Sequence, residues 1–574
     1  MARRRPEARK TETESARARA GAPESAPVEA APHAEPAAIA ERGGAGARRL
    51  GGYAAAVLAT GVLFLLASPA TGVSLAVWLA LVPGGLALCR VERRRGAILL
   101  GIALGAAATT ALSWWLIGAA EEFHGIGPAL GVPVFAVYAL VGQAQLPLWA
   151  LVRWWLRERH DPIAVTALAA AYAGLDWLVP KLFQDTLAVA CFADGRAIQV
   201  VDLGGPFLLT FVIALVSQAI VAVIVRRAAA WRTAGLAAAA LLLVLGYGQV
   251  RRGAVREAAG FAPRIHAVIA QANIGNLEKL ASERGESGVV MDVLRRYGEL
   301  SDREVAGSGP DGREGAAPRR VDLLVWPETA YPLAWGAHRS SADDEVEREL
   351  ATYARQRNVA MVFGGYHREG GLEFNSAIAL GPDGASSVYH KFVLVPFAEA
   401  YPFPASLLRK SLFGTGGTPR TLDVALPGPT PGAPSRMTVR LAPIICYEAL
   451  YPSHVLAGVR GGARAIVNLT NDAWFVSDAE KRMHLAASAV RSVEARRAQL
   501  RATNTGISAM ILPDGEVVAP GPIDREVVLA YDVPLVELDS VAVSLGAWAG
   551  PGCALAALAL LGGLAWRRRR AAAR

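Results

Sequence analysis

Eight long apolar stretches constrain the fold of this chain more than any other feature of its sequence. Each holds roughly the ~20 residues that an α-helix needs to cross a bilayer. They cover approximately residues 51–68, 72–90, 97–119, 127–152, 162–180, 205–225, 233–249 and 543–566. The sequence therefore predicts a polytopic α-helical membrane protein, with a seven-helix transmembrane domain at residues 49–252 and a C-terminal transmembrane helix at 543–566.

Basic residues fall at alternate ends of these stretches, at positions 48, 49, 93–95, 153, 157, 159, 226, 227, 232 and 567–570. Arg251 and Arg252, after the seventh stretch, go against this pattern. The positive-inside rule then places both termini in the cytoplasm and everything between helices seven and eight on the outer side. The net charge of +9 would also fit a nucleic-acid partner, but these arginines stand beside apolar runs, so no nucleic-acid partner is expected.

The N-terminal segment, residues 1–48, consists mostly of Ala, Arg, Glu and Pro. It holds too few large apolar side chains to offset the entropy lost on ordering, so we expect a disordered tail. It also lacks the short apolar core of a signal peptide. The first apolar stretch is therefore expected to remain in the chain as an anchor.

A separate α/β domain is predicted at residues 255–540, where short β-rich runs are bounded mostly by Gly, Pro, Asn or Asp. The runs cover 265–270, 321–326, 359–365, 376–380, 439–445, 465–469 and 507–512. Helix-like stretches at 343–357 and 480–500 lie between some of them. Residues 303–320, rich in Gly, Pro and charge, are expected to form a surface loop.

The four cysteines, Cys89, Cys191, Cys446 and Cys553, include no CxxC pair, so a disulfide framework is not expected. The nine histidines form no HExxH motif and no Cys/His cluster of the kind that zinc requires. We therefore predict no metal and no cofactor. Cys446 is the only cysteine of the soluble domain.

Three short segments place unusual side chains at or near strand ends: WPE at 326–328, YHK at 389–391 and ICYE at 445–448. If the segments converge, Glu328 can take the thiol proton of Cys446 while Lys391 stabilises the charge of an oxyanion. Each residue also has a simpler interpretation. A lone cysteine is commonly a buried hydrophobe, a glutamate after Trp-Pro a turn or cap, and a lysine a solvated charge.

The order Glu, Lys, Cys is that of the nitrilase (carbon-nitrogen hydrolase) superfamily, which residues 264–535 resemble. Further motifs are QANI at 271–274, WPET at 326–329, LVPFxE at 394–399, CYE at 446–448, NDAWF at 471–475 and RATNTG at 501–506. With Lys391, this set resembles the apolipoprotein N-acyltransferases, which also share the arrangement of seven spans, an outer domain and one closing span. The resemblance implies an α-β-β-α sandwich for the outer domain.

Carried over by motif, the resemblance makes Glu328 the general base, Lys391 the oxyanion stabiliser and Cys446 the nucleophile. Glu399 and Glu448 become supporting carboxylates, and which of them orients Lys391 or tunes the base stays open.

The residues beside the nucleophile and in the NDAWF motif have implied roles as well. The backbone N–H of Tyr447 is a second oxyanion donor. Trp474 and Phe475 either contact lipid or pack in the core.

Two positions depart from the family pattern, because Ala398 and Val476 stand where glycine is common. Glycine adopts positive φ easily and β-branched valine does not, so the loops around these positions are expected to differ. No triad position is lost.

The resemblance also implies the reaction. Cys446 takes a fatty acyl chain from a membrane phospholipid, and the thioester passes it to the α-amino group of a diacylated apolipoprotein. The expected location is the bacterial inner (plasma) membrane, with the catalytic domain on the periplasmic side.

Three alternatives remain at this level. A membrane-tethered amidohydrolase would use the same triad with water as acceptor. A non-catalytic scaffold is disfavoured by the complete triad, and a transporter by the scarcity of charged residues within the spans.

Overall fold

The computed structural model describes residues 36–275, 287–305, 320–337, 341–400, 413–417 and 421–574. Residues 1–35 of the expected tail and residues 306–319 of the expected loop lie outside these ranges. The first helix, α1 (Pro36–Ala67), begins well before the boundary predicted near residue 48.

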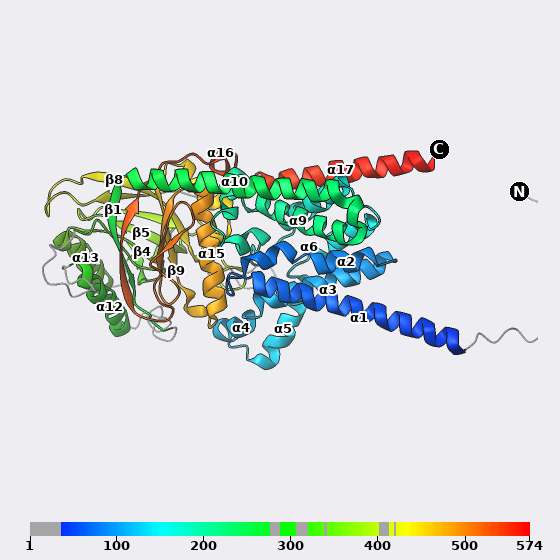
Figure 1. Ribbon diagram of the computed structural model, residues 1–574. Coiled ribbons are helices and arrows are strands. Elements are labelled where there is room, and N and C mark those ends of the chain that lie inside the picture. The colour runs from blue at the N-terminus through cyan, green and yellow to red at the C-terminus, as the bar shows by residue number, and fades with distance from the viewer. Residues whose placement is uncertain (1–35, 276–286, 306–319, 338–340, 401–412, 418–420) are drawn as a thin grey trace, which may run out of the picture. The chain divides into compact units, whose positions relative to one another are not determined.

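The membrane domain is helical throughout (Figure 1). After α1 come α2 (Val82–Cys89), α3 (Arg94–Ser113), α4 (Leu116–His124), α5 (Pro128–Val141), α6 (Gln145–Trp155), α7 (Pro162–Leu178), α8 (Val201–Gly204), α9 (Pro206–Arg226) and α10 (Trp231–Phe261), with α17 (Ala549–Ala572) at the C-terminus. Short 3-10 turns add η1 (Ser74–Leu79), η2 (Leu187–Cys191), η3 (Ala197–Val200) and η4 (Arg227–Ala230).

Within the described residues, six helical segments have the length and apolar composition needed to cross a membrane. They are Arg48–Ala67, Arg94–Ser113, Pro128–Trp155, Pro206–Arg226, Trp231–Phe261 and Ala549–Ala572. The stretches predicted at 72–90 and 162–180 are helical too, but as the shorter apolar helices Ser74–Cys89 and Pro162–Leu178. This chain is a membrane protein with six candidate spans of full length, and the eight spans expected from the sequence stay a prediction for the two shorter helices.

Local sequence explains where two of these helices start. Asp161 caps α7 by accepting a hydrogen bond from the Ala164 amide at 3.2 Å, and Pro162 follows at the first helical position. Before α9, Gly205 adopts φ of 79°, which glycine tolerates, and Pro206 then opens the helix.

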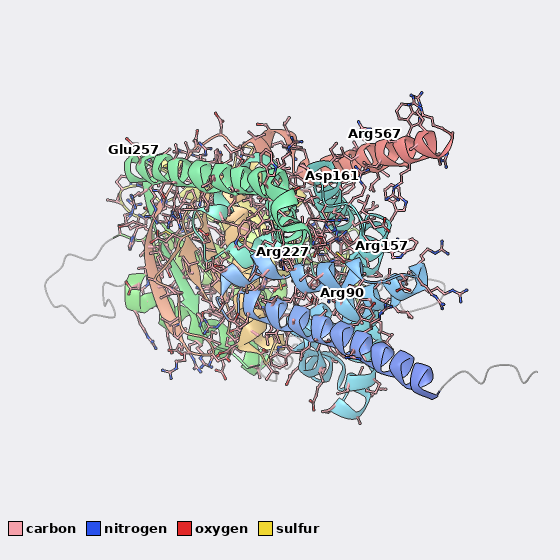
Figure 2. All side chains as sticks on the ribbon, turned by 45° about the vertical axis from the view of Figure 1, so that its right-hand side comes forward. Arg90, Arg157, Asp161, Arg227, Glu257 and Arg567 are labelled. Atoms are coloured by element: carbon pink, nitrogen blue, oxygen red, sulfur yellow. The ribbon has the colours of Figure 1, made fainter. Side chains whose placement is uncertain are left out.

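Several of the basic clusters meet at one end of the helices. Arg568 donates to the Trp155 carbonyl at 3.1 Å, and Arg226 donates to the Glu158 carbonyl at 2.9 Å. In Figure 2 the labelled Arg157 and Arg567 lie at the end away from the strands.

The exceptional Arg251 and Arg252 have a different role, because both are ion-paired near the catalytic domain. Arg251 pairs with Asp202 at 2.9 Å and Arg252 with Asp514 at 3.1 Å. Their deviation from the charge pattern therefore has a structural cause.

The outer domain contains two sheets. The first, in the order β13-β1-β2-β4-β5-β6 with β3 beside β4, comprises β1 (Arg264–Gln271), β2 (Leu323–Val325), β3 (Tyr331–Trp335), β4 (Ala360–Glu369), β5 (Leu372–Leu380), β6 (Ser386–His390) and β13 (Val527–Pro534). The second, in the order β12-β11-β10-β9-β8-β7, comprises β7 (Leu422–Leu426), β8 (Met437–Ile445), β9 (Ala465–Thr470), β10 (Ala498–Thr503), β11 (Ala509–Ile511) and β12 (Val517–Val518).

The sheets pack face to face, and helices cover both outer faces, as the alternation of β1 illustrates. Ile265, Ala267 and Ile269 face the second sheet, whereas Val268 and Ala270 face α12 (Ser287–Val305) and α13 (Ser341–Arg357). The second sheet is covered by α14 (Pro452–Arg460) and α15 (Asp478–Ala495). The predicted α-β-β-α sandwich is confirmed, and Figure 1 shows α12 and α15 on opposite sides of the strands.

The helix predicted at 480–500 was too long, because α15 ends at Ala495 and β10 begins at Ala498. Arg496 adopts a left-handed φ of 53° between them. Its guanidinium binds Asp202 at 2.8 Å and the Gln199 side chain at 2.6 Å, both in the membrane domain. Helix periodicity in the sequence continues past this point, but these long-range contacts end the helix.

Candidate active site

Glu328, Lys391 and Cys446 each follow the end of a strand. Cys446 comes directly after β8 and Lys391 directly after β6, while Glu328 lies three residues beyond the end of β2. The charges of Glu328 and Lys391 both act on the Cys446 thiol, so the structure brings the three predicted residues together.

Lys391 lies between two carboxylates. Its Nζ is 2.9 Å from Oε1 of Glu399 and 3.3 Å from Oε1 of Glu328. Asn375 of β5 donates to the same two oxygens, at 2.9 Å and 2.8 Å. Burial lowers the pKa of Lys391, but the Glu328 and Glu399 carboxylates outweigh burial and raise the pKa above its ordinary value. Lys391 is therefore a fixed positive charge.

Glu328 is held by the backbone as well. Its Oε2 accepts a hydrogen bond from the Asn471 amide at 2.9 Å. Gly364 of β4 passes so close that a Cβ there would lie 2.5 Å from the Glu328 Cα. Only glycine allows this approach, so β4 fixes the position of the carboxylate without touching its charge.

Cys446 occupies a strained position and carries a perturbed thiol. Its φ of 47° is left-handed, which costs a non-glycine residue roughly 1–2 kcal/mol. Burial raises the pKa of the thiol, the Glu328 carboxylate raises it further, and Lys391 opposes both without cancelling them. The resting group is therefore a neutral thiol, which needs a base before it can act as a nucleophile.

Glu448 differs from Glu399, because it contacts backbone groups on both sides of the site. Its Oε2 accepts from the Ile445 amide at 2.7 Å, and its Oε1 accepts from the Phe392 amide at 2.6 Å and the Tyr389 hydroxyl at 2.7 Å. Glu448 is fully buried. It thus ties the residue before Cys446 to the residue after Lys391, whereas Glu399 contacts the ammonium itself.

An aromatic cluster joins the membrane domain to the nucleophile. The rings of Trp115 and Phe475 pack edge to face at 5.3 Å, and Trp115 also contacts Phe183 at 5.1 Å. Phe183 contacts Tyr447 at 6.2 Å, and the Tyr447 hydroxyl donates to the Leu182 carbonyl. The side chain of Trp474 lies outside the described part of the chain.

The two departures from the family pattern leave an ordinary backbone at both positions. Ala398 and Val476 lie outside the left-handed region, whereas the neighbouring Phe397 has φ of 69°. Glu399 keeps its hydrogen bonds to Lys391 and to the Val395 amide at 2.8 Å. The loss of glycine at position 398 therefore does not displace the carboxylate.

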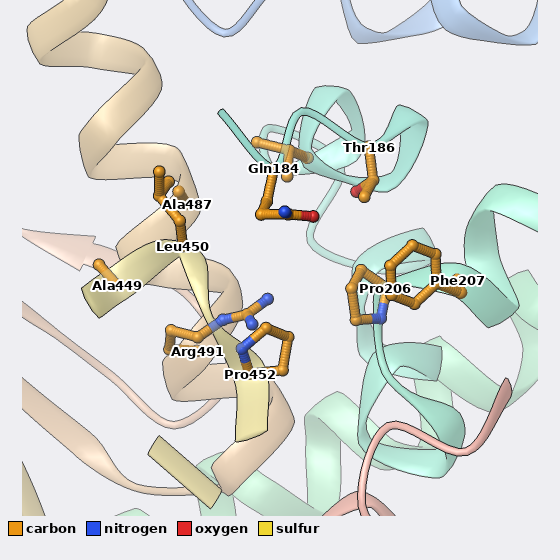
Figure 3. Close-up of a pocket in the computed structure, with 10 residues that line it drawn as sticks. Gln184, Thr186, Pro206, Phe207, Ala449, Leu450, Pro452, Ala487 and Arg491 are labelled. Carbon is orange, nitrogen blue, oxygen red and sulfur yellow. The ribbon is translucent and has the colours of Figure 1, made fainter. Parts of the chain in front are cut away.

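A pocket lies where the membrane helices meet the sandwich (Figure 3). Gln184 and Phe207 line it from the membrane domain, and Leu450 and Arg491 line it from the sandwich. Figure 3 shows the Gln184 amide and the Arg491 guanidinium directed into the space between them. The pocket lining includes no triad residue, so this pocket is beside the triad and does not contain it.

Among the described residues, two groups of side chains are close enough to be considered as metal ligands: Asp472, Glu480 and His484, and His367, Glu369 and His390. In the first, Arg501 already contacts Asp472 at 2.9 Å. In the second, His367 approaches Nε2 of His390 at 3.0 Å, but Glu369 lies 3.8 Å from Nδ1, on the other side of the ring. In both groups the side chains therefore contact one another or Arg501 directly.

Two sequence families match this chain. The carbon-nitrogen hydrolase family matches residues 258–543, and the apolipoprotein N-acyltransferase N-terminal domain matches residues 60–219. Among solved structures, the Nit3 protein of Saccharomyces cerevisiae, of the nitrilase superfamily, is 15% identical with a TM-score of 0.34, over 47% of this chain and 90% of that one.

The membrane helices and the sandwich together define a membrane protein with a carbon-nitrogen hydrolase domain. The apolipoprotein N-acyltransferase of Geobacter metallireducens is 30% identical over 538 residues, covering 90% of this chain and 96% of that protein. That of Gloeobacter violaceus is 30% identical over 553 residues, covering 91% and 95%. The chain belongs to the apolipoprotein N-acyltransferase family and is an acyltransferase.

Proposed function

We propose that this enzyme moves a fatty acyl chain from a membrane phospholipid, through a thioester on Cys446, to the α-amino group of the S-diacylglyceryl cysteine of apolipoproteins. One observation carries the proposal. The half-buried neutral thiol of Cys446 lies close to a lysine that two carboxylates keep charged, and an aromatic cluster from the membrane domain contacts Tyr447, the next residue. The relatives' names, as apolipoprotein N-acyltransferases, supply the acceptor.

The first step forms the thioester. Cys446 Sγ attacks the ester carbonyl carbon while Glu328 takes the thiol proton. The carbonyl oxygen becomes an oxyanion, which the Lys391 ammonium and the Tyr447 N–H stabilise. When the oxyanion collapses, the glyceryl oxygen leaves and takes the proton from Glu328, so a lysophospholipid departs.

The second step consumes the thioester. The lipoprotein amine attacks the thioester carbonyl carbon, and Glu328 accepts a proton from the nitrogen. The amide forms as the Cys446 sulfur leaves, and the sulfur then recovers the proton. Glu399 holds Lys391 in place through both steps, and Glu448 maintains the distance between the two strand ends.

Water must be kept from the thioester, because hydrolysis would end the cycle. The cluster of Trp115, Phe183, Tyr447 and Phe475 supplies apolar surface at this position. We infer that an acyl chain enters the site along it from the bilayer. We propose that both termini are cytoplasmic and that the sandwich lies on the periplasmic side of the bacterial inner membrane, as the distribution of basic residues predicts.

The proposal is tested by following the products in detergent micelles. Purified enzyme receives phospholipid with a labelled acyl chain, with or without a synthetic diacylated lipopeptide. The expected product is a triacylated lipopeptide, with little free fatty acid. Labelled fatty acid as the main product in the presence of lipopeptide would instead make the enzyme a hydrolase.

A further inference from the structure

Behind the nucleophile, His484 of α15 stands between a carboxylate and a carbonyl. Its Nδ1 lies 3.0 Å from Oδ1 of Asp472, and its Nε2 lies 3.1 Å from the carbonyl oxygen of Cys446. His484 is 6% exposed and Asp472 is fully buried. Both nitrogens therefore face oxygen atoms inside the protein.

These contacts define the protonation of the ring. A carbonyl oxygen can only accept, so Nε2 carries a proton. The two carboxylate oxygens of Asp472 face two donors, His484 Nδ1 and the Arg501 guanidinium, so Asp472 accepts as a carboxylate and Nδ1 also carries a proton. Arg501 binds the other carboxylate oxygen at 2.9 Å. His484 is therefore an imidazolium, which donates one hydrogen bond to Asp472 and one to the Cys446 carbonyl.

The carbonyl that His484 binds belongs to the peptide group between Cys446 and Tyr447. In a planar trans peptide, the C=O and the N–H point in opposite directions. Any group that fixes the Cys446 carbonyl therefore also aims the Tyr447 N–H, which is the oxyanion donor of the proposed reaction. A charged donor on the carbonyl also polarises the peptide and strengthens its N–H as a donor.

We propose that His484, as an imidazolium held by Asp472, is the positioning residue that aims and polarises the Tyr447 N–H and holds Cys446 in its left-handed conformation. This inference rests on the proposed function, in which Cys446 is the nucleophile. His484 touches neither substrate nor thiol in this role, because it acts through the peptide group.

Two variants of His484 each keep one of its two hydrogen bonds and lose the other. The amide nitrogen of His484→Gln can reach the position of Nε2 and keep the bond to the Cys446 carbonyl. The shorter His484→Asn can keep the bond to Asp472 but not the bond to the carbonyl. Removing an oxyanion donor typically costs about 100- to 1,000-fold in rate. Because the Tyr447 N–H is misaimed and not removed, we expect acylation to fall about 30- to 100-fold in His484→Asn, and less than about tenfold in His484→Gln.

The experiment compares two reactions of Cys446 in the full-length enzyme in detergent. One is acylation by saturating phospholipid, measured as adduct by peptide mass spectrometry at timed quenches. The other is alkylation by iodoacetamide, which needs the sulfur but forms no oxyanion. We expect His484→Asn to lose acylation rate while its alkylation rate stays within about threefold of the unmodified enzyme.

Other results have distinct meanings. Equal losses in both reactions, unchanged acylation in His484→Asn, or a glutamine variant no faster than the asparagine variant would each overturn the proposal. If His484→Asn does not fold, the acylation rate of His484→Gln is compared with that of the unmodified enzyme. A loss of rate above about tenfold in His484→Gln contradicts the proposal. Failure of the proposed function looks different, since the unmodified enzyme would then form no acyl adduct on Cys446.

Discussion

Glu399 accepts a hydrogen bond from the Lys391 ammonium at 2.9 Å, and this contact is shorter than the 3.3 Å between Lys391 and Glu328. The closest anion to the lysine is therefore not the proposed base. This division leaves Glu328 less tightly engaged with the ammonium, and thus better able to take a proton from Cys446.

Replacing Glu399 by glutamine tests this division of roles. Glu399→Gln removes one negative charge beside Lys391 and leaves Glu328 as its main counter-ion, which makes Glu328 a weaker base. We expect thioester formation to slow by about 10- to 100-fold. The matched control is Asp423→Asn, which breaks the exposed pair with Arg440 and should leave the rate unchanged. A normal rate in Glu399→Gln would remove Glu399 from the mechanism.

Gly364 gives a second prediction, because it acts on Glu328 only through the backbone. In Gly364→Ala the new Cβ would lie 2.5 Å from the Glu328 Cα and 2.6 Å from the Thr329 amide nitrogen. The segment that follows β2 must move away from β4, at a cost of about 1–3 kcal/mol, and acylation should fall more than tenfold. Gly298→Ala is the control, since nothing lies within 4 Å of the added Cβ. Melting temperature and acylation rate, measured on the same samples, check both expectations.

Asp514 links the sandwich to helix α10 in a way that depends on pH. Arg256 and Arg252 contact it at 2.7 Å and 3.1 Å. Burial alone would raise the pKa of Asp514, but these hydrogen bonds lower it below its ordinary value of 3.8. A carboxyl group whose pKa is lower in the folded than in the unfolded protein stabilises the fold. The stabilisation is complete at pH values above the pKa of the unfolded state, and it is lost as the pH falls through the pKa of the folded state.

Asp514→Asn should therefore destabilise the protein by about 1–3 kcal/mol near neutral pH, given that the two arginines are partly exposed. Thermal unfolding in detergent should show a constant difference between variant and unmodified protein from pH 5 to pH 8. Below pH 4 the difference should shrink. A difference that grew on acidification would have the wrong sign and would contradict this account.

Replacing Trp115 tests whether the aromatic cluster guides the acyl chain to the site. It makes two edge-to-face contacts, each worth about 0.5–1.5 kcal/mol, so Trp115→Ala should slow acylation by a long-chain phospholipid about tenfold. A short, water-soluble ester needs no such surface and should react at the normal rate. Trp231→Ala, which removes an exposed tryptophan, is the control. Equal losses with both donors would mean that Trp115 serves the fold and not the acyl chain.

The fold class and the triad region could be predicted from the sequence, because their signals are local. Apolar length identifies the helices, and the motifs around Glu328, Lys391 and Cys446 stand at strand ends. The lengths of individual elements were less accessible. The stop of α15 before Arg496 depends on Asp202 and Gln199, which are about 300 residues away in the chain.

Asn375 and His484 were missed for a similar reason. Asn375 lies in the middle of β5, and only the pairing of β5 with β4 and β6 brings it beside Glu328 and Glu399. His484 stands in a helix and carries no motif of its own, so its contact with the Cys446 carbonyl emerges only when α15 packs against that strand end. The nearby NDAWF and RATNTG motifs, which supply Asp472 and Arg501, were the available signal.

The central claim is that Cys446 carries the acyl chain, and mass spectrometry tests it directly. The enzyme is incubated with phospholipid and no amine, then digested and searched for an acyl adduct. This account predicts an adduct on Cys446, absent in Cys446→Ala, that disappears when a diacylated lipopeptide is added, with an equal amount of triacylated product. A triacylated product formed by Cys446→Ala, or an adduct that the lipopeptide does not discharge, would contradict it.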